Sequence, residues 1–233
     1  MMWFKRIPRV SIVVTCMGRA MHLKQSLPLF LDQNYSRYDV VVVDWNSPDD
    51  LLTYLRVMSC PRLQWTSVKG KEYFHLSAAR NLGASYAMNR CHPDLILFTD
   101  CDILLPDNFL FNNVTQYQRF KRKAPWFHNV FLHSKKMDDG SFDIWGSCLV
   151  PAKQWNKWKY NEEITTYGHE DNEFYNCLRE NKCKNQPLLV DGVKCIKHDD
   201  DLRMKYYKDK PEDMREIRLK NKEKFRFHGH FDA

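Results

Sequence analysis

Two aspartates, Asp100 and Asp102, stand at the end of an apolar run that spans residues 95–98. Four apolar residues in a row predict a buried strand. In an extended chain, side chains at positions i and i+2 leave on the same side, about 6.6 Å apart. Two carboxylates there would be desolvated and would repel each other unless a cation lies between them. Oxygen ligands with room for waters and phosphate oxygens suit Mg²⁺ or Mn²⁺, so the pair predicts a metal site. A cap for the turn before Pro106 is the alternative.

A second group of acids, Glu170, Asp171 and Glu173, crowds the start of an expected helix. An acidic first turn complements the helix dipole, so a capped helix start is one interpretation. Three acids are more charge than a cap needs. A carboxylate in this place could instead act as a general base towards a hydroxyl nucleophile.

Two further side chains each allow a structural and a functional interpretation. His198 follows an expected strand and precedes three aspartates. It is either a surface histidine or a metal ligand through its neutral imidazole. Arg80 lies in the first turn of an expected helix, where it is either a surface charge or a bidentate partner for a phosphate.

The first half of the chain alternates strands and helices. Strands are predicted for residues 10–15, 40–43, 63–68 and 95–98, because these runs are rich in β-branched or apolar residues. Helices are expected between them. We expect a kink or break at Pro28 in the first helix and an N-cap at Ser77 in the third. This order predicts a parallel sheet with helices on its faces.

Ligands of such sheets bind beyond the carboxyl ends of the strands. Arg19, Asp44, Asp100 and Asp102 all follow predicted strands at those ends. The pattern therefore places separate motifs at one edge of the sheet.

The second half mixes element types. Helices are expected over residues 109–120, with a basic end at 121–123, over 151–158 and after residue 169. Strands are expected over 130–133 and 147–150, and residues 188–196 predict a hairpin with an Asp191-Gly192 turn. The charged stretch from residue 202 onwards predicts a helix and tail packed on the outside. We expect one domain over residues 1–201, with halves at 8–105 and 106–201, followed by a tail over 202–233.

Composition narrows the class of protein. The chain has 233 residues, 43% of them hydrophobic, and a net charge of +7. A basic balance suits anionic partners such as nucleotide phosphates, nucleic acid or an acidic membrane surface. Neither a signal peptide nor a membrane span is found, so we expect a cytoplasmic protein, with peripheral membrane contact left open. The eight cysteines are scattered, which predicts reduced thiols rather than a zinc site.

Six short segments occur in an order that is typical of one enzyme family. They are 15–19 (Thr-Cys-Met-Gly-Arg), 41–49 (Val-Val-Val-Asp-Trp-Asn-Ser-Pro-Asp), 76–84 (Leu-Ser-Ala-Ala-Arg-Asn-Leu-Gly-Ala), 98–102 (Phe-Thr-Asp-Cys-Asp), 146–151 (Gly-Ser-Cys-Leu-Val-Pro) and 168–173 (Gly-His-Glu-Asp-Asn-Glu). Over residues 8–200 the chain resembles GT-A glycosyltransferases of the family 2 group, close to the β-1,4-galactosyltransferase-like branch. The resemblance implies a Rossmann-like α/β/α sandwich with a mostly parallel central sheet.

On the donor side, the resemblance implies a role for five residues. Thr15 and Asp44 would contact the nucleotide base, with Asp44 on a uracil ring. Arg19 and Arg80 would lie near the ribose and the diphosphate. Asp100 would face the ribose or the metal.

The resemblance also implies a metal site and a catalytic base. Asp102 and His198 would bind Mn²⁺ or Mg²⁺, Asp171 would be the base, and Glu170 would orient the acceptor. The sugar pocket would be walled by Trp145, Gly146 and His169. The related branch has Trp-Gly-Gly before its acidic pair, where this chain has Tyr-Gly-His at 167–169. Sugar and acceptor selectivity are therefore left open.

These features together predict an inverting, metal-dependent glycosyltransferase that moves a sugar from a nucleotide-sugar, with UDP favoured, to a hydroxyl of a glycan or glycoconjugate. A sugar-nucleotide nucleotidyltransferase is one alternative, but that class opens with a glycine-rich loop and residues 16–19 hold one glycine. A basic module that binds nucleic acid or membrane is the other. Acids interrupt its basic tail, which favours a solvated helix and no nucleic-acid partner.

Overall fold

The computed structural model describes residues 6–123, 128–132, 144, 146–209 and 213–224. Within these residues a seven-stranded sheet has the order β3-β2-β1-β4-β7-β6-β8. Its members are β1 (Val10–Cys16), β2 (Tyr38–Trp45), β3 (Leu63–Val68), β4 (Leu95–Asp100), β6 (His128–Leu132), β7 (Cys148–Pro151) and β8 (Cys183–Pro187). Only β7 runs opposite to the others. The predicted α/β architecture with a mostly parallel sheet is confirmed.

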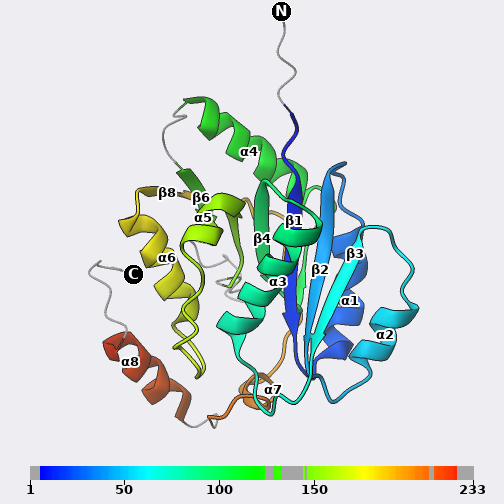
Figure 1. Cartoon of the computed structure of the whole chain (residues 1–233), viewed down its shortest axis with the longest axis vertical. Coiled ribbons are helices and arrows are strands. Elements are labelled where there is room, and N and C mark those ends of the chain that lie inside the picture. The colour runs from blue at the N-terminus through cyan, green and yellow to red at the C-terminus, as the bar shows by residue number, and fades with distance from the viewer. Residues whose placement is uncertain (1–5, 124–127, 133–143, 145, 210–212, 225–233) are drawn as a thin grey trace, which may run out of the picture.

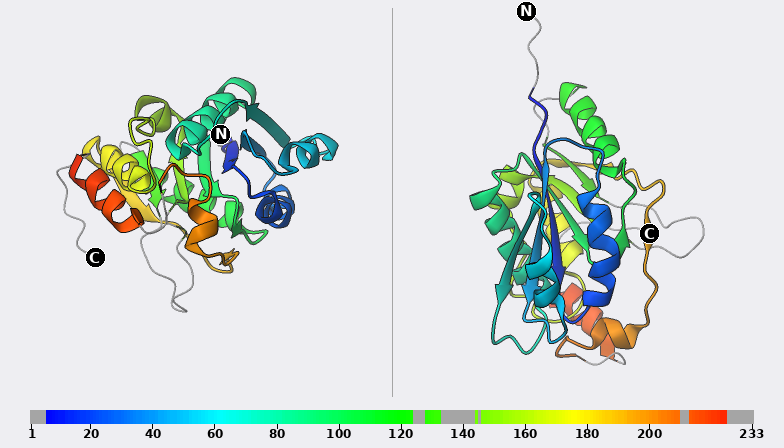
Figure 2. Two further views of the ribbon diagram at one scale, coloured as in Figure 1. Left: turned by 90° about the horizontal axis from the view of Figure 1, so that it is seen from below. Right: turned by 90° about the vertical axis from the view of Figure 1, so that its right-hand side faces the viewer.

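Helices cover both faces of this sheet, as Figure 2 shows. One face packs against α1 (Ala20–Leu31), α2 (Leu51–Val57) and α4 (Phe109–Lys123). The other packs against α3 (Leu76–Arg90), α5 (Ala152–Lys157) and α6 (Glu170–Glu180). Strand β1 lies inside the sheet and packs against both layers, with Ile12 and Val14 on the first face and Val13 on the second. Because both faces are buried, the sequence of this strand is mostly apolar rather than alternating.

Two local expectations for the helices are corrected. Of the kink or break expected at Pro28, the break does not occur, because α1 runs through this residue to Leu31, and the kink stays a prediction. Burial of one face of α1 in the core compensates for the missing N–H. The third helix begins at Leu76, so Ser77 is not its N-cap. His75 takes that position, and its ring nitrogen accepts a hydrogen bond from the Ala78 amide at 3.4 Å.

The expected hairpin over residues 188–196 is also wrong. Its turn does form, with the Val193 amide donating to the Val190 carbonyl at 3.0 Å. The flanking segments do not pair with each other. Instead, β8 ends before the turn and lies parallel to β6, and β9 (Lys194–Cys195) pairs with β5 (Ile103–Leu104).

The C-terminal segment holds two helices, α7 (Asp200–Met204) and α8 (Met214–Lys224). In Figure 1, both lie at the end of the molecule where the parallel strands finish, and α8 lies beside α6. The described part of the expected charged tail, residues 202–209 and 213–224, therefore lies at the carboxyl ends of the parallel strands (Figure 1). No helix among the described residues combines the length and the apolar character that a membrane span requires.

Candidate active site

A pocket of about 630 Å³ lies at the carboxyl ends of β1 and β4. Thr15 and Asp100, which are neighbours in the register of these two strands, are part of its wall. Further lining comes from the turn after β1, the segment after β4, the start of α3, Gly146, the start of α6, and residues from β9, α7 and α8 and the loops beside them. The position agrees with the rule that ligands of open parallel sheets bind beyond the strand ends.

Asp102 and His198 meet in one corner of this pocket although 96 residues separate them. The two-stranded sheet of β5 and β9 brings them together, because Asp102 directly precedes β5 and His198 follows β9. The Ile196 amide also donates to the Asp102 carbonyl at 2.8 Å. As a result, His198 Nε2 lies 2.7 Å from Asp102 Oδ2.

The donor set of this corner fits a divalent cation. His198 Nδ1 lies 3.0 Å from the carbonyl of Asp199, which could accept its proton. In that tautomer the Nε2 lone pair and the Asp102 carboxylate oxygen would both be free to bind a cation, whereas without one a proton on Nε2 joins the two by a hydrogen bond. Adjacent ligands of an octahedral Mg²⁺ or Mn²⁺ ion lie about 3 Å apart.

The protein supplies only part of a coordination shell. No group of three or more histidine, cysteine or acidic side chains in the described part of the chain could hold a metal ion. The remaining positions of an ion at Asp102 and His198 would go to water and to phosphate oxygens, which is the usual arrangement for Mg²⁺ with nucleotides.

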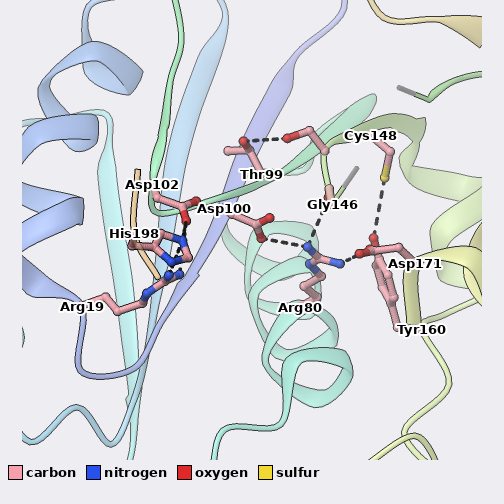
Figure 3. Close-up of polar contacts among 11 residues, drawn as sticks. Arg19, Arg80, Thr99, Asp100, Asp102, Gly146, Cys148, Tyr160, Asp171 and His198 are labelled. Carbon is pink, nitrogen blue, oxygen red and sulfur yellow. Dashed lines mark hydrogen bonds and ion pairs between the residues drawn. The ribbon is translucent and has the colours of Figure 1, made fainter. Parts of the chain in front are cut away.

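Arg19 currently supplies the positive charge in this corner (Figure 3). Its guanidinium lies 3.3 Å from Asp102 Oδ2 and 2.6 Å from His198 Nε2. The turn after β1 sets its position, since the Gly18 amide donates to Ser47 Oγ and the Ala20 amide to Asp49 Oδ2. Burial alone would raise the pKa of Asp102, but the hydrogen bond from His198 and the charge of Arg19 hold it below its usual range.

Asp100 and Arg80 lie differently from the expectation. Residues 101–102 form a turn rather than continuing the extended strand, and among the described residues Asp100 pairs with Arg80 rather than with the corner of Asp102 and His198. Its carboxylate accepts a hydrogen bond from Arg80 Nη2 at 2.9 Å. Arg80 is only 1% exposed and lies behind the pocket wall, so the structure does not present it to a diphosphate.

Arg80 instead bridges two carboxylates. Its Nη1 donates to Asp171 in a short hydrogen bond, and its Nη2 donates to Asp100 and to the Gly146 carbonyl. The guanidinium also lies 5.1 Å from the centre of the Tyr160 ring. Figure 3 shows Arg80 between Asp100 and Asp171. A buried arginine is tolerated here because both acids compensate its charge.

Asp171 and Glu170 occupy the first turn of α6 and line the pocket. The loop before them turns sharply, with Gly168 and His169 both in the left-handed region at φ +86° and +80°. Burial raises the pKa of Asp171 to about 8, with Glu170 and Asp100 adding to the effect and Arg80 opposing it. Burial also raises the pKa of Glu170. A carboxyl group that titrates near neutral pH suits general base catalysis.

The remaining predicted residues divide between the pocket and its surroundings. Thr15, Gly146 and His169 line the pocket. Asp44 is not part of the lining, since it is 3% exposed and its carboxylate accepts from the Ser47 amide at 2.9 Å. The expected contact of Asp44 with a base therefore finds no support. Trp145 lies outside the described residues.

Several lining residues were missed by sequence reasoning. Tyr206, Tyr207, Arg218 and Lys222 all belong to the C-terminal segment and line the pocket. The adjacent tyrosines at 206–207 were the one available signal, because large aromatic side chains are out of place in a fully solvated charged helix.

A family model described as "Glycosyl transferase family 2" matches residues 11–130. The S. aureus protein TarS, residues 1–349, in complex with UDP-GlcNAc, matches with a TM-score of 0.64 at 17% identity, over 90% of this chain and 64% of that one. The mannosyltransferase PcManGT from Pyrobaculum calidifontis, in complex with GDP-Man and Mn²⁺, matches with a TM-score of 0.60 at 16% identity, over 78% of this chain and 55% of that one.

At this level of identity, the likeness to solved structures shows the GT-A fold. This chain spans 64% and 55% of the lengths of the two matched structures. The search of curated proteins finds no significant match.

Proposed function

The chain belongs to glycosyl transferase family 2, and on that premise we propose that it transfers a sugar from a nucleotide-sugar to a hydroxyl group, with a divalent metal ion and with inversion at the anomeric carbon. The observation that carries the proposal is the composition of one pocket. The pocket joins Asp102 and His198, a pair whose donor atoms suit a divalent cation, to an acidic helix start at Asp171. A direct displacement from a diphosphate requires a cation that stabilises the leaving group and a base that accepts the proton of the acceptor hydroxyl.

Asp102 and His198 would hold Mn²⁺ or Mg²⁺ in this reaction. When bound there, the ion would stabilise the negative charge that develops on the leaving diphosphate. Arg19 would turn its guanidinium from these ligands to the diphosphate, where it can donate two parallel hydrogen bonds. Thr15 and Asp100, at the ends of β1 and β4, would lie on the nucleoside side of the pocket.

Asp171 would act as the general base. The acceptor hydroxyl gives its proton to the Asp171 carboxylate while its oxygen bonds to the anomeric carbon, and the bond from that carbon to the diphosphate oxygen breaks. Glu170, beside it, would orient the acceptor through hydrogen bonds. The Oε2 atom of Glu170 is buried and has no hydrogen-bond partner among the described residues, so a ligand hydroxyl that reached it would supply one.

The finer assignments rest on the same site. A UDP-sugar is the favoured donor and a glycan or glycoconjugate the acceptor. The pairing of Asp102 with His198 supports the β-1,4-galactosyltransferase-like branch. Residues 8–105 would form the donor half and residues 106–201 the acceptor half, to which α7 and α8 add a wall.

Product analysis tests the proposal. The chain is incubated with Mn²⁺, a panel of nucleotide-sugars and candidate acceptors, and the nucleotides are separated by chromatography. Free UDP together with a new glycoside of inverted anomeric configuration, read by NMR, is the expected result. UTP formed with added pyrophosphate would instead identify a nucleotidyltransferase. Transfer that is unchanged by chelation of the metal would contradict the metal requirement.

A further inference from the structure

Hydrogen bonds join α8 to the loop that leads into α6. Asn221, which is 7% exposed, donates to the Gly168 carbonyl at 2.8 Å. Its side chain also exchanges hydrogen bonds with Thr166. The approach is so close that a Cβ atom on Gly168 would lie 2.7 Å from Arg218 Cγ. The orientation of α8 is therefore fixed relative to Glu170 and Asp171, two and three residues beyond Gly168.

Arg218 is held in place over the pocket. Its guanidinium lies 4.9 Å from the centre of the Tyr167 ring, and its Nη2 donates to Tyr167 Oη at 2.9 Å. Both contacts are with an uncharged side chain, so they orient the guanidinium without neutralising it. A guanidinium has five N–H donors, and those not used by Tyr167 remain for a ligand.

Lys222 adds a second positive charge one helical turn further along α8. Positions i and i+4 share a face of a helix, and both residues line the pocket. No ion pair among the described residues includes Lys222, whereas Lys220, outside the pocket lining, pairs with Glu216 at 2.6 Å. Two like charges on one face of a helix are mildly unfavourable in isolation, and an anion bound beside both would remove that repulsion.

Three acids lie near these charges, and no ion pair among the described residues joins any of them to Arg218 or Lys222. Burial raises the pKa of Glu170, and the charge of Arg218 is close enough to oppose that rise in part. Asp171 forms its ion pair with Arg80, and Asp102 forms its own with Arg19 and His198. A bound metal ion and Arg19 would already meet the charge of a donor diphosphate. The α8 charges lie instead beside the loop that precedes Asp171, and the group that gives its proton to this base is the acceptor.

We propose that Arg218 and Lys222 form an anion subsite for the acceptor, which carries a phosphate or carboxylate group close to the hydroxyl that is glycosylated. This assignment rests on the proposed function, since it takes the side of Asp171 as the acceptor side. Arg218 would bind the anion through two N–H groups, and Lys222 would contribute a point charge.

Binding measurements with matched sugars test the subsite. The full chain is saturated with UDP and Mn²⁺ and titrated with glucose 6-phosphate, glucuronate and glucose, and then with the corresponding N-acetylglucosamine pair, using ligand-detected NMR. We expect the charged member of at least one pair to bind about tenfold more tightly than the neutral sugar, with the preference falling as NaCl is raised. The phosphate and uronate arms show which anion is preferred.

Two variants on the same helix make the test specific. Lys222→Gln should reduce the preference for the charged sugar by about three- to tenfold. Lys220→Gln removes the same charge from α8 outside the pocket and should leave the preference unchanged. Equal or absent binding of charged and neutral sugars, or equal losses in both variants, would overturn the subsite. Failure of UDP and Mn²⁺ to bind would instead contradict the proposed function, and the sugars can still be titrated onto the chain without them.

Discussion

Arg80 and Asp171 form a largely buried ion pair that joins α3 to α6. The side chain of Arg80 is 1% exposed and that of Asp171 is 13% exposed. The same guanidinium reaches Asp100 at the end of β4. One buried cation therefore sets the position of the proposed base relative to the central strand of the site.

This ion pair predicts the pH dependence of transfer. A base that titrates at about 8 must lose its proton to act, so kcat/KM should rise with pH and level off above pH 8. Because the charge of Arg80 lowers the pKa of Asp171, Arg80→Met should move this rise to higher pH, whereas Arg80→Lys should largely retain it. Initial rates between pH 5.5 and 9.5 check both.

Arg80→Met should also destabilise the fold, because it leaves a buried carboxylate without its partner, at a cost of about 3–5 kcal/mol. Arg6→Met is the control, since Arg6 pairs with Asp94 on the surface and its loss should cost less than about 1 kcal/mol. Denaturant unfolding gives both values. A rise of kcat/KM at the same pH in wild type and Arg80→Met would show that Arg80 does not tune the base.

The metal corner predicts which side chains govern Mn²⁺ affinity. Asp102→Asn and His198→Gln should each weaken Mn²⁺ binding in the presence of UDP by about tenfold or more, because each removes one of the two proposed protein ligands. Electron paramagnetic resonance of free Mn²⁺ measures this directly. Asp50→Asn, which changes an exposed carboxylate near Lys24, is the control. Unchanged titration curves for both ligand variants would place the ion elsewhere.

The acids of α6 predict how stability varies with pH. Burial raises the pKa of Glu173 from 4.5 to about 7, so the folded chain holds a proton there that the unfolded chain releases. The free energy of unfolding should therefore decrease as pH rises from about 4.5 to 7, by up to about 1.4 kcal/mol per pH unit. Asp171 extends the same trend towards pH 8.

Glu173→Gln should flatten this dependence, because it removes the titrating group while keeping its shape. Urea unfolding at pH 5, 6, 7 and 8 measures the slope for wild type and variant. Glu163→Gln, at an exposed position, should leave the slope unchanged. A variant slope equal to that of the wild type would mean that Glu173 does not contribute.

Gly146 allows the contact between Arg80 and Asp100 to be tested by a change of geometry alone. A Cβ atom there would overlap Asp100 Oδ2 and lie 2.7 Å from Arg80 Nη2. Gly146→Ala should therefore separate Arg80 from Asp100 without changing any charge, and should lower kcat by more than it changes the affinity for UDP. Gly70→Ala is a less direct comparison, since Gly70 has open space around it but a positive φ. A normal kcat in Gly146→Ala would show that the site tolerates the displacement.

The sequence predicted the elements whose signals are local. The strands β1 to β4 are runs of β-branched or apolar residues, and the helices between them show their apolar spacing directly. The proximity of Asp102 and His198 was implied only by the family resemblance, because no local pattern relates residues 96 positions apart.

The misses came from tertiary contacts that no local pattern records. Strand β8, with the sequence Cys-Lys-Asn-Gln-Pro, has little strand character and forms because it can pair with β6. Arg80 was assigned to a phosphate because no local pattern shows that Asp100 and Asp171 lie beside it. These two carboxylates, distant in sequence, balance its charge and allow its burial. Helix α8 was expected to be solvated because its pocket-facing residues are charged.

Sugar transfer by the Asp171→Asn variant, with donor binding measured on the same sample, tests the central claim most directly. The amide cannot accept the acceptor proton, so kcat should fall by about 10²- to 10⁴-fold while the affinity for UDP and Mn²⁺ stays within about threefold of wild type. Glu173→Gln on the same helix should retain transfer. Transfer at the wild-type rate by Asp171→Asn would show that the base lies elsewhere and would contradict the account.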